Sequence, residues 1–249
     1  MSDKFLILFF LERHMKKHVY VFCLLFVLSG AFELKANITR NDTVICPLDG
    51  EKIIFKITTG LNTWGSYTDM EKTGIMGDYY KEIINTCPKC HFSGYIEDFR
   101  RSYKEEVLKN LIEFVAKFKD RSMDEVSQCE MAGEILAVQN ADNRDIAYAY
   151  LVASYQLRMQ DSLKEKRKNL QRKVIEHYNQ AIQMKEYDEK EKASYLFLIG
   201  DMYRRVGDFE MALKYYQGAT AEKKKHKWVK NAIELMKPLA EKKDDNNKI

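Results

Sequence analysis

The chain has 249 residues, of which 45% are hydrophobic and 31% are charged, which is the composition of an ordinary globular protein with one large or two modest domains. Its formal net charge of +4 is small for this length and gives no reason to expect nucleic-acid binding, which needs a clustered basic face. The 3 prolines and 11 glycines are few, which favours long helices over a fold of many turns.

The first 36 residues have the features of a targeting segment. Met15-Lys16-Lys17-His18 supplies a positive start, and residues 19–32 form an apolar run of signal-peptide length. This run is shorter than the roughly 20 residues that span a bilayer. We therefore predict that residues 1–36 are a signal peptide whose true start is Met15, and that the protein is exported to the periplasm or the medium. The alternative is an uncleaved segment that anchors the protein to a membrane.

Two cysteine-containing turns follow this segment. The first is Cys46-Pro47-Leu48-Asp49-Gly50, and the second is Cys87-Pro88-Lys89-Cys90. In a C-P-x-C-G knuckle, proline fixes φ after the first ligand and glycine accommodates a positive φ, so that two thiolates converge on one cation. Two facing knuckles supply the four soft ligands that a structural Zn²⁺ prefers. The pair of turns therefore predicts a metal-binding ribbon.

The match to paired knuckles is partial. Asp49 stands where a second cysteine is usual, and His91 stands where glycine is usual. Three sulfurs and a carboxylate can still form a tetrahedral zinc site. We predict a structural Zn²⁺ on Cys46, Cys87, Cys90 and Asp49, with His91 as the other candidate for the fourth ligand. In an oxidising compartment a disulfide within the three cysteines is the alternative, and free thiols or redox chemistry are a third.

Residues 37–100 are predicted to form a zinc-ribbon-like, β-rich unit around these turns. Residues 52–59 alternate apolar and polar side chains as a strand does, residues 79–84 suit a short helix, and residues 92–99 could pair back as a strand. Such a unit has too small an apolar core to be stable alone, so a metal or a disulfide should stabilise it. Four carboxylates in it are interpreted as solvated groups rather than acid–base pairs: Asp69, Asp78, Glu97 and Asp98.

Short motifs carry a resemblance to a known family: Cys46-Pro47, residues 65–69, Gly77-Asp78-Tyr79-Tyr80, Cys87-Pro88-Lys89-Cys90, Gly94-Tyr95 and Asp98-Phe99. Together they resemble an uncharacterised family of bacterial proteins in which a zinc-ribbon-like unit with two C-P-x-C motifs precedes tetratricopeptide-like (TPR-like) helices. The resemblance covers most of the chain after residue 36 and departs from the family's pattern at Asp49. It implies the ribbon and the helices but no activity.

Beyond residue 100 the apolar period changes from two to about 3.6, which predicts amphipathic helices. The first covers residues 103–119, and the second runs to residue 139 after Ser122 as its N-cap. Cys129 lies in the second helix and is expected to pack in the core rather than bind metal. A last helix over residues 225–240 should cap the stack.

The most specific helical signal is a tetratricopeptide pattern: Leu196, Ile199, Gly200, Tyr203, Gly207, Phe209, Ala212, Tyr216 and Ala219. Its small residues would let two antiparallel helices approach closely. A degenerate repeat precedes it: Tyr148, Leu151, Tyr155, Tyr178 and Ala181. The Lys- and Arg-rich insertion at residues 160–172 is expected to extend a solvated hairpin, and residues 242–249 are expected to form a charged, frayed tail.

The predicted fold is therefore mainly α, with a zinc-ribbon-like unit at 37–100, TPR-like helical hairpins at 101–241 and the tail. The predicted function is an exported, non-catalytic interaction or scaffold protein that binds a protein partner through its helices, with membrane contact only through an uncleaved N-terminal segment. The alternative is a thiol–disulfide redox protein that uses Cys87 and Cys90, because C-x-x-C is the motif of such enzymes. No phosphate loop, H-E-x-x-H motif or nucleophile elbow indicates another enzyme class.

Overall fold

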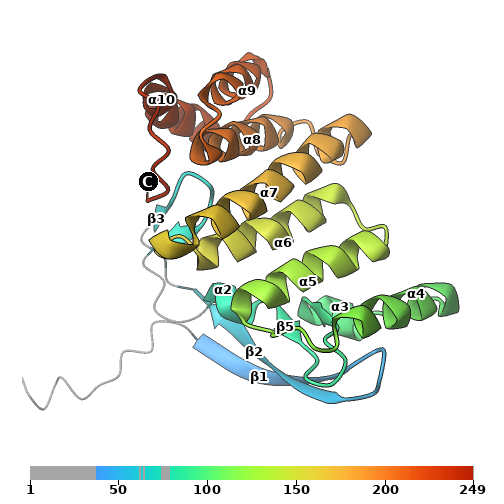
Figure 1. Ribbon diagram of the computed structural model, residues 1–249. Coiled ribbons are helices and arrows are strands. Elements are labelled where there is room, and N and C mark those ends of the chain that lie inside the picture. The colour runs from blue at the N-terminus through green and yellow to red at the C-terminus, as the bar shows by residue number, and fades with distance from the viewer. Residues whose placement is uncertain (1–37, 62, 64, 74–78, 249) are drawn as a thin grey trace, which may run out of the picture. The chain divides into compact units, whose positions relative to one another are not determined.

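A computed structural model describes residues 38–61, 63, 65–73 and 79–248 of the chain. Within these ranges the fold is mainly α, as predicted, with short strand pairs in the N-terminal part (Figure 1). The predicted signal peptide at residues 1–36 lies outside the described residues. Among the helices that are described, none combines the length and the hydropathy needed to cross a membrane.

The described strands pair two by two, each pair antiparallel: β1 (Ile38–Ile45) with β2 (Lys52–Gly60), β3 (Gly65–Ser66) with β4 (Lys72–Thr73), and β5 (Asn85–Thr86) with β6 (Ser93–Gly94). The strand predicted over residues 52–59 is confirmed by β2. Ile53 and Phe55 on this strand are buried, whereas Ile54 between them is 64% exposed. The β1–β2 hairpin therefore has one inner and one outer face, as the alternation requires.

The helices follow in chain order: α2 (Tyr79–Glu82), α3 (Ile96–Arg100), α4 (Glu105–Val115), α5 (Glu125–Val138), α6 (Asn143–Gln156), α7 (Lys164–Met184), α8 (Lys192–Val206), α9 (Phe209–Ala221) and α10 (Lys227–Glu241). Short 3₁₀ turns precede α5 and α7, at Ala116–Phe118 and Asp161–Leu163. The helices predicted at residues 79–84, 103–119 and 225–240 are confirmed by α2, α4 and α10, with ends shifted by a few residues.

The strand predicted over residues 92–99 is wrong beyond Gly94, because β6 ends at that residue and α3 begins at Ile96. The side chain of Asp98 accepts a hydrogen bond from the backbone N–H of Tyr95 (2.9 Å), which starts the helix in the manner of a capping box. Asp98 is buried, so its interpretation as a solvated carboxylate is wrong as well. Its pKa is raised, since burial disfavours the charged form more than the Tyr95 N–H favours it.

Aspartates cap two of the later helices. In α5 the N-cap is Asp124, whose carboxylate accepts a hydrogen bond from the N–H of Ser127 (2.7 Å), so the prediction of Ser122 as the cap is wrong. In α9 the cap is Asp208, which accepts from the N–H of Met211 (3.2 Å). Both carboxylates also lie at the positive end of a helix dipole.

The apolar core of the N-terminal part crosses residue 100, where the unit boundary is predicted. One cluster of buried side chains joins the hairpin and the cysteine turns to α4 and α5: Val44, Cys46, Ile53, Phe55, Cys87, Phe92, Phe99, Leu111, Val115, Met131 and Ile135. Residues 37–249 form one compact unit by their contacts. The N-terminal ribbon therefore packs on α4 and α5, and these contacts compensate for its own small apolar core.

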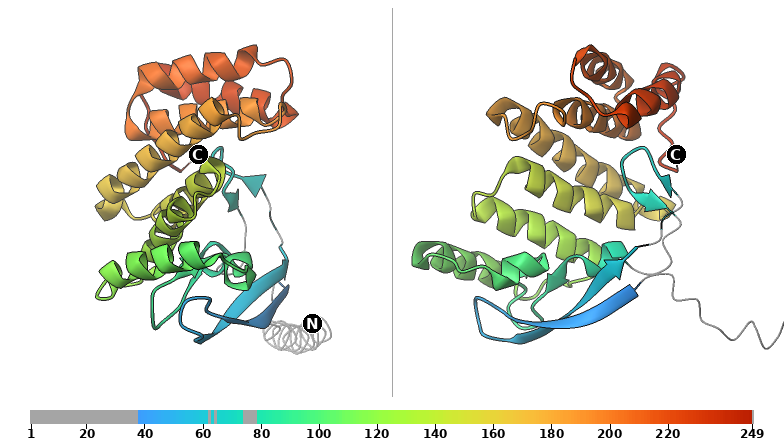
Figure 2. Two further views of the ribbon diagram at one scale, coloured as in Figure 1. Left: turned by 90° about the vertical axis from the view of Figure 1, so that its right-hand side faces the viewer. Right: turned by 180° about the vertical axis from the view of Figure 1, so that it is seen from behind.

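From α5 to α9 each helix packs against the next one in sequence, and α10 packs on α8 and α9, which gives the layered stack in Figures 1 and 2. Gly200 in α8 permits a close approach, since a Cβ there would lie 2.8 Å from the ring of Tyr216 in α9. A similar contact occurs between α5 and α6, where a Cβ on Gly133 would lie 2.9 Å from the ring of Tyr150. Two of the neighbouring helix pairs, α5–α6 and α8–α9, thus have a glycine–tyrosine contact.

The insertion at residues 160–172 is helical, as expected, but the prediction that it is solvated is wrong for part of it. Arg167 and Gln171 are buried. The Arg167 guanidinium donates to the backbone carbonyls of Leu157 (2.9 Å) and Arg158 (3.1 Å), which lie past the end of α6. This basic side chain therefore closes a helix C-terminus instead of facing water.

The prediction of a frayed tail after residue 242 is wrong for residues 244–248, which pack on the stack. Asn247 is only 6% exposed. Its side-chain oxygen accepts a hydrogen bond from Nε2 of Gln171 (2.7 Å), and its backbone carbonyl accepts one from Nη1 of Arg205 (2.8 Å). Composition alone indicates solvation here, whereas specific polar partners on α7 and α8 hold the segment.

Candidate metal centre

The two cysteine turns have the same backbone hydrogen-bond pattern. In the first, the N–H of Cys46 donates to the carbonyl five residues on (2.8 Å), and the N–H of Gly50 donates back to the Cys46 carbonyl (3.0 Å). In the second, Cys87 and His91 make the same two bonds, at 2.8 and 2.9 Å. The turns therefore have equivalent positions, although their sequences match only in part.

This equivalence explains both departures from the knuckle pattern. The fifth residue of each turn has a positive φ, which is +74° at Gly50 and +66° at His91. Glycine adopts this conformation freely, and histidine is among the other residues found there more often than most. The fourth residue of each turn is Asp49 or Cys90. Asp49 therefore occupies the position in the first turn that a thiolate occupies in the second.

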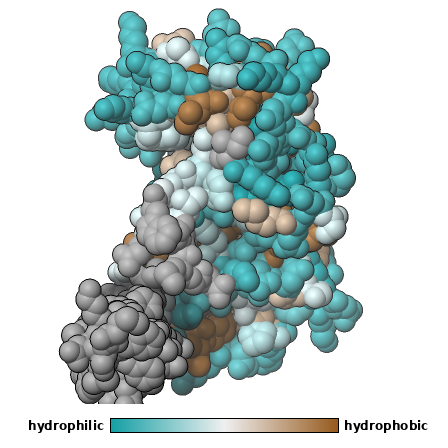
Figure 3. All heavy atoms as spheres, turned by 90° about the vertical axis from the view of Figure 1, so that its left-hand side faces the viewer, coloured by the Kyte–Doolittle hydropathy of each residue, from teal (hydrophilic) through white to brown (hydrophobic). Residues whose placement is uncertain are grey.

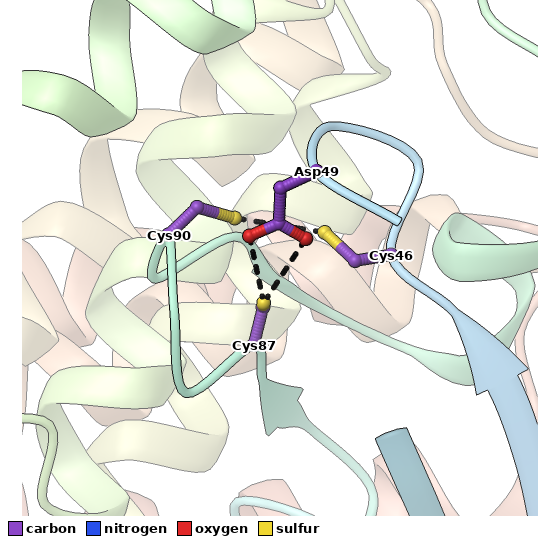
Figure 4. A group of neighbouring side chains, drawn as sticks. All are labelled: Cys46, Asp49, Cys87 and Cys90. Carbon is purple, nitrogen blue, oxygen red and sulfur yellow. Dashed lines mark hydrogen bonds between the residues drawn. The ribbon is translucent and has the colours of Figure 1, made fainter. Parts of the chain in front are cut away.

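The structure brings Cys46, Asp49, Cys87 and Cys90 together at one point (Figure 4), with one potential ligand atom from each within 4.8 Å of all the others. The Sγ atoms of Cys46 and Cys90 are 3.5 Å apart. The Sγ atom of Cys87 lies 3.6 and 3.4 Å from the two carboxylate oxygens of Asp49. All four residues predicted as metal ligands therefore meet, although nearly forty residues separate the two turns.

These distances suit a tetrahedral cation site. Zn–S bonds of about 2.3 Å at tetrahedral angles place neighbouring sulfurs about 3.8 Å apart, close to the separations that these side chains already have. Three soft sulfur donors and one carboxylate oxygen are an accepted ligand set for zinc. The cluster could therefore hold a metal ion with little movement of its side chains.

His91 lies outside this cluster. Its Nδ1 atom is 3.0 Å from the backbone carbonyl of Phe118, in the 3₁₀ turn that follows α4. The His91 ring thus connects the second cysteine turn to the 3₁₀ turn after α4. Of the two candidates for the fourth ligand, the structure places Asp49 beside the sulfurs.

Two of the four side chains in the site are buried, and the other two are partly exposed to solvent. Cys46 is 2% exposed and Cys87 is fully buried, whereas Asp49 and Cys90 are half-buried. The buried pair packs in the apolar core that contains Phe55 and Phe92. A cation here would have protein ligands in all four positions, which is the arrangement of structural rather than catalytic zinc.

The four groups shift one another's ionisation. A hydrogen bond with Cys90 lowers the pKa of Cys46, while the same contact and burial raise the pKa of Cys90. Burial raises the pKa of Cys87. Burial also opposes the ionisation of Asp49, but the Glu51 N–H and the neighbouring thiols outweigh it, so the pKa of Asp49 is lowered. Asp49 and Cys46 are thus the groups most ready to bind a cation, and binding would release the remaining thiol protons.

The cysteine turn at residues 87–90 lies between β5 and β6 and does not begin a helix. Redox C-x-x-C motifs lower a thiol pKa at a helix N-terminus, whereas here burial raises the pKa of Cys87. The Sγ atoms of Cys46 and Cys90, which lie in different turns, are 3.5 Å apart. The geometry therefore favours a structural cluster that spans both turns over a redox motif.

Cys129 is buried in α5 among apolar side chains, which confirms its predicted packing role. Burial raises its pKa to about 12, so the thiol stays protonated at neutral pH. Cys129 is therefore a suitable control in experiments on the three cysteines of the cluster.

A second group of ionisable side chains, which the sequence reasoning missed, lies within the helical stack. Asp69 is buried and not solvated as predicted, and its carboxylate pairs with Arg158 (2.5 Å). Asp201 in α8 pairs with Arg204 (2.9 Å) and Arg205 (2.8 Å). The spacing of Asp201 before two arginines at i+3 and i+4 was a usable signal for the second part of this group.

A model of a family described as "Uncharacterized protein conserved in bacteria (DUF2225)" matches residues 68–242, which is more than half of the chain. The chain belongs to this family. The resemblance to an uncharacterised bacterial family is thereby confirmed. No curated protein and no solved structure matches the chain.

The family match divides the candidate metal centre. Cys87 and Cys90 lie inside the matched segment, together with helices α2 to α10, whereas Cys46 and Asp49 precede it. Half of the ligand set therefore stands on the β1–β2 hairpin, ahead of the part of the chain that defines the family.

Proposed function

We propose that this protein is an exported, non-catalytic interaction or scaffold protein, in which TPR-like helices bind a protein partner and a structural zinc centre stabilises the N-terminal ribbon. The observation that carries the proposal is the closed set of Cys46, Asp49, Cys87 and Cys90. Four protein ligands leave no open position for a reacting water, which separates structural from catalytic zinc. The metal would hold the two turns together and supply no chemistry of its own.

The helical stack supports the interaction role. Its helices pack one on the next from α5 to α9, as in solenoids built from helical hairpins, and small residues at Gly133 and Gly200 permit close approach in two of the pairs. Solenoids present extended surfaces to other proteins. A groove of about 440 Å³ lies between the β3–β4 pair and α10, where Trp228 and Leu235 line it and Leu235 is 63% exposed. An exposed leucine at the edge of a groove is a suitable contact for a partner.

A ribbon stabilised by a disulfide is the alternative, and the short distance between the sulfurs of Cys46 and Cys90 favours it. The Sγ atoms of Cys46 and Cys90 are 3.5 Å apart, and closing to a bond length of about 2.05 Å would need a small movement of the two turns. This cross-link would replace the metal as the stabilising element and leave the helices with the same role. Thiol–disulfide catalysis by Cys87 and Cys90 has less support, since Cys87 is fully buried.

The interaction role is tested by site-specific photo-cross-linking in the native bacterium. A photoreactive residue replaces Leu235 on α10 or, as a matched control, Ile54 on β2, since these two aliphatic side chains are 63% and 64% exposed. We expect a discrete protein adduct from position 235 and none from position 54. The absence of an adduct at 235, or the same adducts at both positions, would contradict the proposal.

Export is tested separately. Residues 1–40 are fused to a reporter enzyme that is active only outside the cytoplasm, with Met15 or Met1 as the start. Activity with either start supports export, and its absence with both contradicts it. The mass of the exported product shows whether the segment is cleaved.

A further inference from the structure

Residues 244–248, which follow α10, lie beside the β3–β4 pair, near the end of α6 and the start of α7 (Figure 2). Their backbone carbonyls face three arginines on the stack. Nη1 of Arg204 donates to the carbonyls of Asp244 (3.0 Å) and Asn246 (2.9 Å). Nη1 of Arg205 donates to the carbonyl of Asn247 (2.8 Å), and Arg158 donates to the same oxygen. We call Arg158, Arg204, Arg205 and Gln171 the arginine cradle.

The cradle is a built and buried polar site. Arg204 and Arg205 are fully buried, and Arg158 and Gln171 are nearly so. Asp201 neutralises the two arginines of α8 through Nε of each, which leaves their Nη1 groups for carbonyls. Asp69 and Glu71 on the β3–β4 pair do the same for Arg158. Charge is therefore balanced inside the protein, while main-chain acceptors come from residues 244–248.

Two side chains of the bound segment add sequence selectivity to these main-chain contacts. Asn247 accepts a hydrogen bond from Nε2 of Gln171 (2.7 Å). Asp245 pairs with Lys164 (3.0 Å) and Lys168 (3.2 Å), which lie on the first turns of α7. An acidic residue two positions before an asparagine is thus what the cradle and its neighbouring lysines recognise.

We propose that the arginine cradle is a peptide-binding site, that residues 244–248 are its tethered occupant, and that a partner enters it as a short segment with an Asp-x-Asn pattern. This inference rests on the proposed interaction function and names the chemistry of the partner. The face that carries residues 244–248 is mostly hydrophilic, with small hydrophobic areas (Figure 3), which suits polar recognition. The binding mode combines main-chain contacts for affinity with side-chain contacts for selectivity.

Hydrogen-bond demand explains why a peptide must fill the cradle. If residues 244–248 left, the Nη1 atoms of Arg204 and Arg205 would lose their carbonyl acceptors in a buried site, which is costly unless other acceptors replace them. A partner segment that turns as residues 244–248 do offers carbonyls at the same spacing. The tethered segment has an effective concentration on the order of millimolar, so a free peptide binds well only after the tethered segment is weakened.

The test uses the full chain and a fluorescent peptide with the sequence of residues 243–248, followed by fluorescence anisotropy. The variant Asn247→Ala loosens the tethered segment, so we expect it to bind the peptide about tenfold more tightly than the wild-type chain does. A peptide with alanine in place of Asn247 should lose that gain. Lys242→Ala, which changes an exposed side chain outside the cradle, serves as the control and should behave as wild type.

Equal affinity of the Asn247→Ala and wild-type chains for the peptide, or equal affinity of both peptides, would overturn the inference. If Asn247→Ala does not fold, the wild-type chain gives a second readout. Excess peptide should displace residues 244–248 and speed hydrogen exchange of their amides, and unchanged exchange would also overturn it. Neither failure alters the cross-linking result at position 235, so the cradle and the proposed interaction function are tested apart.

Discussion

The N-terminal ribbon and the helical stack of this protein keep their structures by different means. In the ribbon, hairpin and turn residues share a small apolar core, and four ligand-type side chains converge from Cys46, Asp49, Cys87 and Cys90. In the stack, a much larger apolar core surrounds a group of buried arginines and carboxylates. The short β segment relies on its contacts with α4 and α5 and, in our proposal, on a metal, whereas stacked helices can bury ionic groups because their apolar surface is large.

The largest difference should appear when one ligand of the ribbon is removed. Cys87→Ser removes a buried sulfur donor of the proposed zinc centre, so we expect loss of metal binding and of hydrogen-exchange protection in the β1–β2 hairpin, while α6 to α10 keep theirs. Structural zinc contributes on the order of 10 kcal/mol in small zinc domains. Metal analysis and hydrogen exchange by mass spectrometry measure both effects.

Cys129→Ala is the matched control for that experiment. Cys129 is buried like Cys87 but lies in α5, away from the cluster. Its removal should cost about 1 kcal/mol from the small cavity and leave the metal in place. Equal metal content in the Cys87→Ser and Cys129→Ala proteins would remove the distinction between the two regions.

The stack should be most sensitive at its buried ion pairs. Asp201→Asn leaves Arg204 and Arg205 without their buried carboxylate, so we expect a loss of about 3–5 kcal/mol in the free energy of unfolding, measured with urea. Arg144→Ala breaks exposed pairs with Asp142 and Asp145 and should cost less than about 1 kcal/mol. Similar losses in both variants would show that burial does not set the cost.

The same group predicts how the stability of the stack depends on pH. Burial opposes ionisation of Asp201, but Arg205 and Arg204 lower its pKa from 3.8 to about 2. A lowered pKa gives stability that is present above pH 3.8 and is lost as the pH falls through 2, here about 2 kcal/mol. Burial raises the pKa of Glu71 to about 6. This second group acts in the opposite direction, so stability should fall as the pH rises from 4.5 through 6.

Urea unfolding of wild type and Glu71→Gln between pH 2 and 7 checks these signs. The wild-type protein should be most stable between about pH 4 and 5, and Glu71→Gln should lose the decline above pH 4.5 because it carries no titrating group. Asp201→Asn should flatten the acid limb. A wild-type profile that rises steadily from pH 4.5 to 7 would contradict the assignment of Glu71.

The smallest expected effect concerns helix spacing within the stack. In Gly200→Ala the new Cβ would lie 2.8 Å from the Tyr216 ring, so we expect a loss of about 1–3 kcal/mol. Gly218→Ala in the neighbouring helix has its nearest atom, Cδ1 of Leu196, at 3.9 Å and should stabilise the protein by up to about 1 kcal/mol. Thermal unfolding measures both, and a stabilising Gly200→Ala would show that the close approach is not needed.

Local patterns in the sequence predicted the ribbon and the helices well. The two cysteine turns were identified because Pro47, Gly50 and Pro88 mark tight turns next to thiols. The helices were predicted because their apolar residues recur about every 3.6 residues. The choice between Asp49 and His91 could not be made, since it depends on the contact of His91 with the Phe118 carbonyl, which no local pattern encodes.

The arginine cradle could not be predicted because its parts come from distant segments. Arg158 follows α6, Gln171 lies in α7, and Arg204 and Arg205 lie in α8, so the cradle forms only in the folded stack. Composition alone made residues 242–249 look like a solvated tail. Long-range polar contacts outweigh local charge there, since Gln171 and Arg205 hold Asn247 from positions 76 and 42 residues earlier in the chain.

The most direct test of the zinc centre is the intact mass and the metal content of the protein recovered from its exported location without reductant. We predict one zinc ion per chain and no covalent modification of Cys46, Cys87 and Cys90. Asp49→Ala should lower the affinity of the site for zinc. A protein without zinc, lighter by two hydrogen atoms, would instead be stapled by a disulfide and would contradict the zinc centre.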